Sequence, residues 1–116
     1  MGVYCFKWKR GPWIKVGHYH RDNPWSRIAH RGWKSVTCPD IALHYAPASD
    51  FELLYWSPAL SRRDERAAHR MFPDRFGEWI GADREADVVE ALTALDPRNA
   101  AGDCDAAAAL ATRRLL

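Results

Sequence analysis

The first twenty residues alternate between apolar and polar positions with the period of two that is typical of β-strands. Residues 3–8 (VYCFKW) and 13–17 (WIKVG) are rich in β-branched and aromatic side chains, and residues 9–12 between them have turn composition. These runs predict an antiparallel hairpin. The alternation places Tyr4 on the same face as the other aromatic residues of the first strand, and Lys15 on the same face as the glycine of the second.

Three later segments have the spacing or the end signals of helices. Residues 25–31 follow Asn23 and Pro24, a pair suited to the N-cap and the first turn of a helix. The segment 61–72 begins with a serine followed three residues later by an acid, and its apolar residues recur at helical spacing until a proline. Residues 83–95 fit an acidic amphipathic helix.

The remaining apolar runs complete the expected order of elements. Residues 51–56 predict a buried strand, or alternatively an apolar helical turn, and residues 76–80 predict a short strand. Residues 36–38 and 41–45 are also expected to be extended. The order β-β-α-β-α-β-α predicts an α+β fold with a small mixed or antiparallel central sheet flanked by helices.

Length and composition limit the number of domains and the cellular context. A chain of 116 residues with 47% hydrophobic residues is expected to form one core, over residues 1–95, with the Ala-rich stretch 96–116 as a packed C-terminal helix or a frayed tail. No apolar run approaches the roughly 20 residues that span a bilayer, and the N-terminus has no apolar stretch typical of a secretory signal. Three cysteines without a CxxC pair favour a reducing cytoplasm.

The charges are segregated along the chain. Residues 1–39 hold eight lysines and arginines against Asp22 alone, whereas residues 40–116 hold 9 basic and 14 acidic residues. This division predicts one anion-attracting face on an acidic body, and therefore a nucleic-acid partner. Four tryptophans in the basic segment suit either base stacking or core packing, and core packing is the more frequent role of tryptophan. The candidate nucleic-acid-binding residues of this segment are Lys7, Lys9, Arg10, Arg21, Arg31 and Lys34.

One ordered set of motifs runs through residues 2–80. Gly2-Val3-Tyr4 is followed after ten residues by Lys15-Val16-Gly17, then by Arg27 on the first expected helix and by Glu65 on the second. This order and spacing resemble the GIY-YIG nuclease superfamily. Lys15 stands where the family has its second tyrosine, and the Gly-Glu-Trp at 77–79 resembles an often phage-associated branch. The asparagine that many members carry late in the domain has no match here.

The resemblance implies a GIY-YIG-like fold and a metal-dependent reaction. Glu65 would hold the metal, Mg²⁺ or Mn²⁺, because one hard carboxylate is enough for an ion that keeps most of its waters. Arg27 would bind the scissile phosphate, since its planar fork can take two oxygens. The candidate catalytic residues are Tyr4, Lys15, His18, Arg27, Glu65 and His69.

The identity of the general base stays open between two residues. An unperturbed phenol has a pKa near 10, so Tyr4 can act as a base at neutral pH only if a cation at Lys15 or His18 stabilises its phenolate. Alternatively, Tyr4 and His18 divide the proton transfer between them. His69 follows Glu65 by one helical turn and could orient the metal-bound water, contact phosphate or protonate the leaving group. A zinc site at His18 and His20, with His30 or Cys38 as a further ligand, is an alternative, although phosphate contact is favoured.

Together these features predict a metal-dependent endonuclease that hydrolyses phosphodiester bonds of DNA, where the preference for DNA over RNA comes from the family resemblance. The competing hypothesis is a catalytically inactive module that binds nucleic acid or protein on the same scaffold. A domain of this size could form a homodimer to cut two strands. No motif in the sequence supplies extended base readout.

Overall fold

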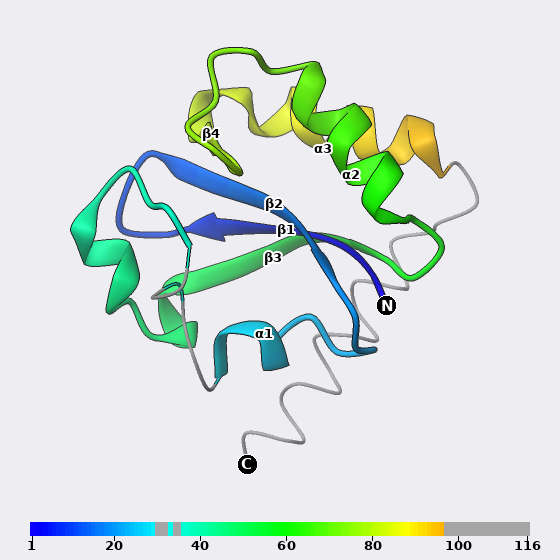
Figure 1. Ribbon diagram of the computed structural model, residues 1–116. Coiled ribbons are helices and arrows are strands. Elements are labelled where there is room, and N and C mark those ends of the chain that lie inside the picture. The colour runs from blue at the N-terminus through cyan, green and yellow to red at the C-terminus, as the bar shows by residue number, and fades with distance from the viewer. Residues whose placement is uncertain (30–32, 34–35, 97–116) are drawn as a thin grey trace.

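A computed structural model describes residues 1–29, 33 and 36–96, which form a four-stranded antiparallel sheet with helices on both faces (Figure 1). The elements are β1 (Gly2–Trp8), β2 (Trp13–Tyr19), α1 (Ser26–Ala29), β3 (Phe51–Ser57), α2 (Arg62–Arg70), β4 (Trp79–Gly81) and α3 (Glu85–Leu95). Short 3₁₀ helices cover Ile41–His44, Ala48–Asp50 and Ala82–Arg84. The strand order in the sheet is β3-β1-β2-β4. Of the helices described, none is both long and apolar enough to cross a bilayer.

Most of the expected elements are confirmed. The hairpin forms with Tyr4 opposite Gly17, and α2 begins at the expected capping box, in which the Asp64 carboxylate accepts hydrogen bonds from Ser61. The prediction of an extended segment over 41–45 is wrong. The Asp40 side chain accepts a hydrogen bond from the Ala42 amide (2.9 Å) and so initiates a 3₁₀ helix instead.

Other expectations differ in detail or fall outside the described residues. Residues 36–38 form no strand, and β4 begins three residues later than the predicted run, after a turn in which Gly77 has a φ of +59°. The expected C-terminal element of 96–116 lies beyond the described residues except for Asp96. The sheet is wholly antiparallel, which selects one of the two sheet types left open by the sequence.

Each face of the sheet carries its own apolar core. On one face, α2 and α3 cover an aliphatic core of β-strand residues, which includes Val3, Cys5, Ile14 and Val16. On the other face, α1 and the segment before β3 cover an aromatic core, which includes Tyr4, Phe6, Trp33, Phe51 and Trp79. The described residues are thus organised around one sheet, and the alternation along β1 divides its side chains between the two cores.

The edge of β2 is where the two faces meet. The short strand β4 pairs only with Trp13 to Lys15, so β2 continues past its partner. At the end of the pairing, the Val16 amide donates to the Glu78 carbonyl (3.1 Å), and the Val16 carbonyl accepts from Nε2 of His69 (2.8 Å). These two contacts bring α2 and the turn before β4 to the same point of the sheet edge.

Candidate functional site

Tyr4, Lys15 and Gly17 form the centre of the site on the aromatic face. Nζ of Lys15 donates a hydrogen bond to the Tyr4 hydroxyl at 2.7 Å, and both side chains are 1% exposed. The Tyr4 ring lies directly over Gly17, where an added Cβ would stand 2.3 Å from the Tyr4 hydroxyl oxygen. Glycine is therefore required at position 17 to make room for the phenol, which is a packing reason and not a conformational one.

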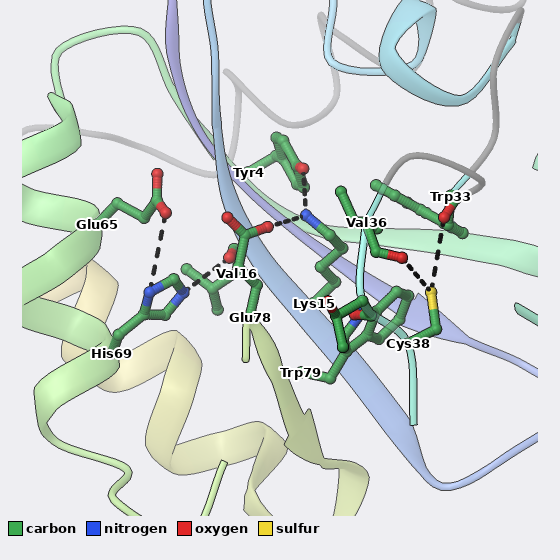
Figure 2. Close-up of polar contacts among 11 residues, drawn as sticks. Tyr4, Lys15, Val16, Trp33, Val36, Cys38, Glu65, His69, Glu78 and Trp79 are labelled. Carbon is green, nitrogen blue, oxygen red and sulfur yellow. Dashed lines mark hydrogen bonds and ion pairs between the residues drawn. The ribbon is translucent and has the colours of Figure 1, made fainter. Parts of the chain in front are cut away.

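Glu78 completes this centre, and the sequence analysis gave it no catalytic role. Its carboxylate accepts a hydrogen bond from Lys15 and forms an ion pair with it (Figure 2). Lys15 pairs with Trp79 in the sheet, and this pairing places Glu78, the residue before Trp79, beside the lysine. The sequence did contain a signal for this contact. A buried lysine needs a carboxylate beside it, and Glu78 directly precedes the strand that pairs with the segment of Lys15.

Burial and charge act in opposite directions on this cluster. Burial raises the pKa of Tyr4, and the adjacent Lys15 ammonium offsets only part of that rise. Burial alone would lower the pKa of Lys15, but its contacts with Tyr4 and Glu78 outweigh burial and raise it. At neutral pH Tyr4 is therefore mainly a neutral phenol, and it lies beside the Lys15 ammonium.

Trp33 joins Arg27 to the same cluster. The Arg27 guanidinium carbon lies 4.9 Å from the centroid of the Trp33 ring, and Nζ of Lys15 lies 4.7 Å from it. Trp33 is completely buried and packs edge-on against Trp79, with ring centroids 5.5 Å apart. The tryptophan thus serves core packing, as favoured from the sequence, and it holds two cations near Tyr4.

Glu65 and His69 approach the cluster from α2, one helical turn apart. A carbonyl oxygen can only accept a hydrogen bond, so the contact with Val16 places the proton of His69 on Nε2 and leaves Nδ1 facing Glu65 at 3.8 Å (Figure 2). Burial lowers the pKa of His69. The imidazole is therefore neutral near pH 7, and its hydrogen bond to the Val16 carbonyl fixes the helical turn that carries Glu65.

The Glu65 carboxyl has a pKa close to neutral pH. Burial raises its pKa to about 7, the nearby Glu78 carboxylate adds to the rise, and Lys15, Arg62 and Arg66 oppose it. A bound divalent cation would relieve both unfavourable effects, and a carboxylate oxygen is the ligand that Mg²⁺ prefers. Among the described residues no three His, Cys, Asp or Glu side chains cluster as a metal ligand set. These residues fit an ion held by Glu65 and otherwise by water.

His18 is not brought together with Tyr4. It lies opposite Val3 in the hairpin, on the face that packs against α2, whereas Tyr4 and Lys15 point to the other face. Burial, and then the charge of Arg62, lower the pKa of His18. Its Nδ1 atom is buried without a hydrogen-bond partner among the residues described. The structure thus separates the two candidates for the general base.

The candidate nucleic-acid-binding residues of the N-terminal segment are only partly available. Nζ of Lys7 pairs with Glu85 at 2.7 Å, and Nε of Arg10 pairs with Asp50 at 2.9 Å. Lys9 and Arg21 are exposed. Arg31 and Lys34 lie outside the described residues, as does His30 of the alternative zinc site.

The site therefore gathers side chains from both strands of the hairpin, from α1, from α2 and from the turn before β4. Tyr4, Lys15, Arg27, Glu65 and Glu78 influence one another electrostatically, because the pKa values of Tyr4 and Glu65 each respond to the charges of several of the others. Comparison with protein-family models, curated proteins and solved structures finds no match to this chain.

Proposed function

We propose that this chain is a metal-dependent endonuclease that hydrolyses phosphodiester bonds of DNA on a GIY-YIG-like fold. The observation that carries the proposal is the convergence of two cations, two carboxylates, a phenol and an imidazole at one sheet edge from five separate segments of the chain. Phosphodiester hydrolysis needs these parts, namely a phosphate-binding cation, a metal ligand and a proton-transferring group. The residues concerned are Tyr4, Lys15, Arg27, Glu65, His69 and Glu78.

Each residue has a chemical task in this proposal. Glu65 would hold Mg²⁺ or Mn²⁺, which supplies Lewis-acid stabilisation of the phosphoryl oxygens and a more acidic water. Arg27 binds the scissile phosphate through its guanidinium fork. Tyr4 orients the attacking water and accepts its proton in the phenolate form, which the adjacent Lys15 ammonium stabilises. His69 and Glu78 act through Glu65 and Lys15 as positioning residues.

A non-catalytic binding module is the second candidate, and one observation favours it. Tyr4 and Lys15 are each 1% exposed, so neither side chain is open to solvent in the free protein. A catalytic role requires that substrate or water reach the Tyr4 hydroxyl, whereas a binding role requires only the exposed charges around it. The two candidates therefore differ in whether the buried cluster takes part.

Cleavage assays on matched variants test the proposal. Labelled single-stranded, duplex and branched DNA are incubated with Mg²⁺, Mn²⁺ or EDTA and with the wild type, Glu65→Ala or Arg27→Ala. Glu90→Ala on the exposed surface of α3 removes a carboxylate away from the site and serves as the control. We expect metal-dependent cleavage by the wild type and the control, and loss of cleavage in both site variants.

Two results would contradict this assignment in different ways. Wild-type rates in Glu65→Ala or Arg27→Ala would exclude these residues from the chemistry. Binding of DNA without cleavage under every metal condition would favour the binding module, because attachment through phosphate contacts survives EDTA and weakens steeply with salt.

A further inference from the structure

The outer surface of α2 carries four exposed arginines, Arg62, Arg63, Arg66 and Arg70, which we call the arginine stripe. At 100° per residue they occupy about a quarter to a third of the helix circumference. The helix buries Glu65, Ala68 and His69 against the sheet. The stripe lies beside this buried surface, on the side of Glu65 and His69. Asp64 lies at the opposite border of the buried surface.

The charges of the stripe are not neutralised within the part of the chain that the structure describes. No ion pair or hydrogen bond joins these four guanidinium groups to another described residue, although Arg10 and Arg84 each pair with aspartates. Asp64, the other acid of the helix besides Glu65, accepts hydrogen bonds from the amide and hydroxyl of Ser61. Arginines at spacings of three and four residues repel one another and destabilise an isolated helix. The stability of the helix therefore does not explain why these four positions are arginine.

The stripe adjoins the candidate metal ligand. Arg62 and Arg66 lie close enough to Glu65 to oppose the rise of its pKa, and Arg62 also acts on His18. A polyanion bound along the stripe would therefore reach Glu65 at the helix border. Successive arginines four residues apart are about 6 Å apart along the helix axis, close to the axial rise of roughly two nucleotides of a DNA strand, about 7 Å.

We infer that the arginine stripe of α2 is a docking surface for the phosphodiester backbone that flanks the scissile phosphate. This inference rests on the proposed function and names the surface that holds its substrate. Arginine forks match pairs of phosphate oxygens, and contacts to the backbone carry no sequence information, so binding along the stripe is independent of base sequence. DNA is favoured over an acidic protein because the stripe continues into a site equipped for phosphate chemistry.

Salt-dependent binding in EDTA tests the surface separately from cleavage. A labelled short duplex is titrated between about 50 and 200 mM salt with the wild type, with the triple variant Arg63→Gln/Arg66→Gln/Arg70→Gln, and with the corresponding triple lysine variant. Arg62 is left in place because it acts on both Glu65 and His18. Arg84→Gln is the single-charge control, since Arg84 already pairs with Asp74 and Asp87.

The glutamine variant should reduce the slope of log K against log salt by roughly 2 to 3, because each phosphate contact contributes about 0.9. The lysine variant should keep the wild-type slope, since counterion release depends on charge, and Arg84→Gln should change nothing. Circular dichroism checks that each variant is folded. If the triple glutamine variant fails to fold, Arg66→Gln and Arg70→Gln are measured singly, each with an expected change of about 0.9.

Several results would overturn the inference, and they differ from failure of the nuclease proposal. An unchanged slope in the glutamine variant, or no DNA binding by the wild type, would remove the stripe as the docking surface. Tighter binding of polyglutamate than of an oligonucleotide of equal charge would assign it to an acidic protein instead. Stripe-dependent binding without cleavage under any metal condition would leave the surface in place and overturn only the catalytic proposal.

Discussion

Replacing Glu65 by glutamine should stabilise the fold above neutral pH while it abolishes metal-dependent cleavage. Glu65 is buried beside Glu78, and its pKa is raised from 4.5 to about 7 in the folded protein. In the unfolded chain the carboxyl ionises at its ordinary pKa. The folded state must therefore hold an unfavourable carboxylate at high pH, and glutamine, which has a similar shape and no charge, removes that cost.

The sign and size follow from linkage between protonation and folding. Because the folded pKa lies above the unfolded value, the wild type has its full stability below about pH 4.5 and loses stability as the pH rises toward 7. Each pKa unit corresponds to roughly 1.4 kcal/mol, so the full difference is on the order of 3 kcal/mol. The variant should match the wild type at pH 4 and exceed it by that order at pH 8.

Urea unfolding of both proteins at several pH values from 4 to 8 measures this difference. The curve of variant minus wild type should be flat at acid pH and rise between about pH 4.5 and 7. Added Mg²⁺ should stabilise the wild type and not the variant, since a ligand that binds only the folded state adds to its stability. A difference that does not change with pH, or a wild type more stable than the variant at pH 8, would refute the described environment of Glu65.

Three further substitutions test the buried cluster. Gly17→Ala places a methyl group 2.3 Å from the Tyr4 hydroxyl and should lower the unfolding free energy by about 1–3 kcal/mol in urea titrations. Glu78→Gln leaves the Lys15 ammonium without its carboxylate and should cost about 1–3 kcal/mol, less than for a fully buried pair because the Glu78 side chain is 41% exposed; it should also move the Glu65 transition to lower pH. Tyr4→Phe removes the hydroxyl that Lys15 contacts and should lower the cleavage rate by roughly 10²–10⁴ while the salt dependence of DNA binding stays unchanged.

Local signals in the sequence accounted for most of the fold. The hairpin followed from alternation and turn composition, and α2 followed from a serine and an acid three residues apart, which form the observed capping box. The segment 41–45 was wrongly predicted as extended, because its apolar and aromatic residues suggested a strand. The Asp40 side chain caps a 3₁₀ helix there, and composition does not reveal such a contact.

The site was predictable where its residues lie in recognisable motifs. The position of His69 one turn after Glu65 followed from helix geometry, whereas the register that sets Tyr4 opposite Gly17 became visible only in the structure. The role of Glu78 was missed because it depends on which strand pairs beside Lys15. The arginine stripe was missed because net charge was summed over residues 40–116, where many acids conceal four arginines that share one helix surface.

The lysine in the second motif and the glutamate before Trp79 are linked by electrostatics. An ammonium that is 1% exposed is strongly destabilised unless a carboxylate lies beside it, and Glu78 is the carboxylate that lies there. A neutral tyrosine at position 15 would not need a carboxylate beside it. The Lys-Val-Gly and Gly-Glu-Trp motifs, 60 residues apart, therefore act as one unit, in which the acid that stabilises the lysine also raises the pKa of the candidate metal ligand, Glu65.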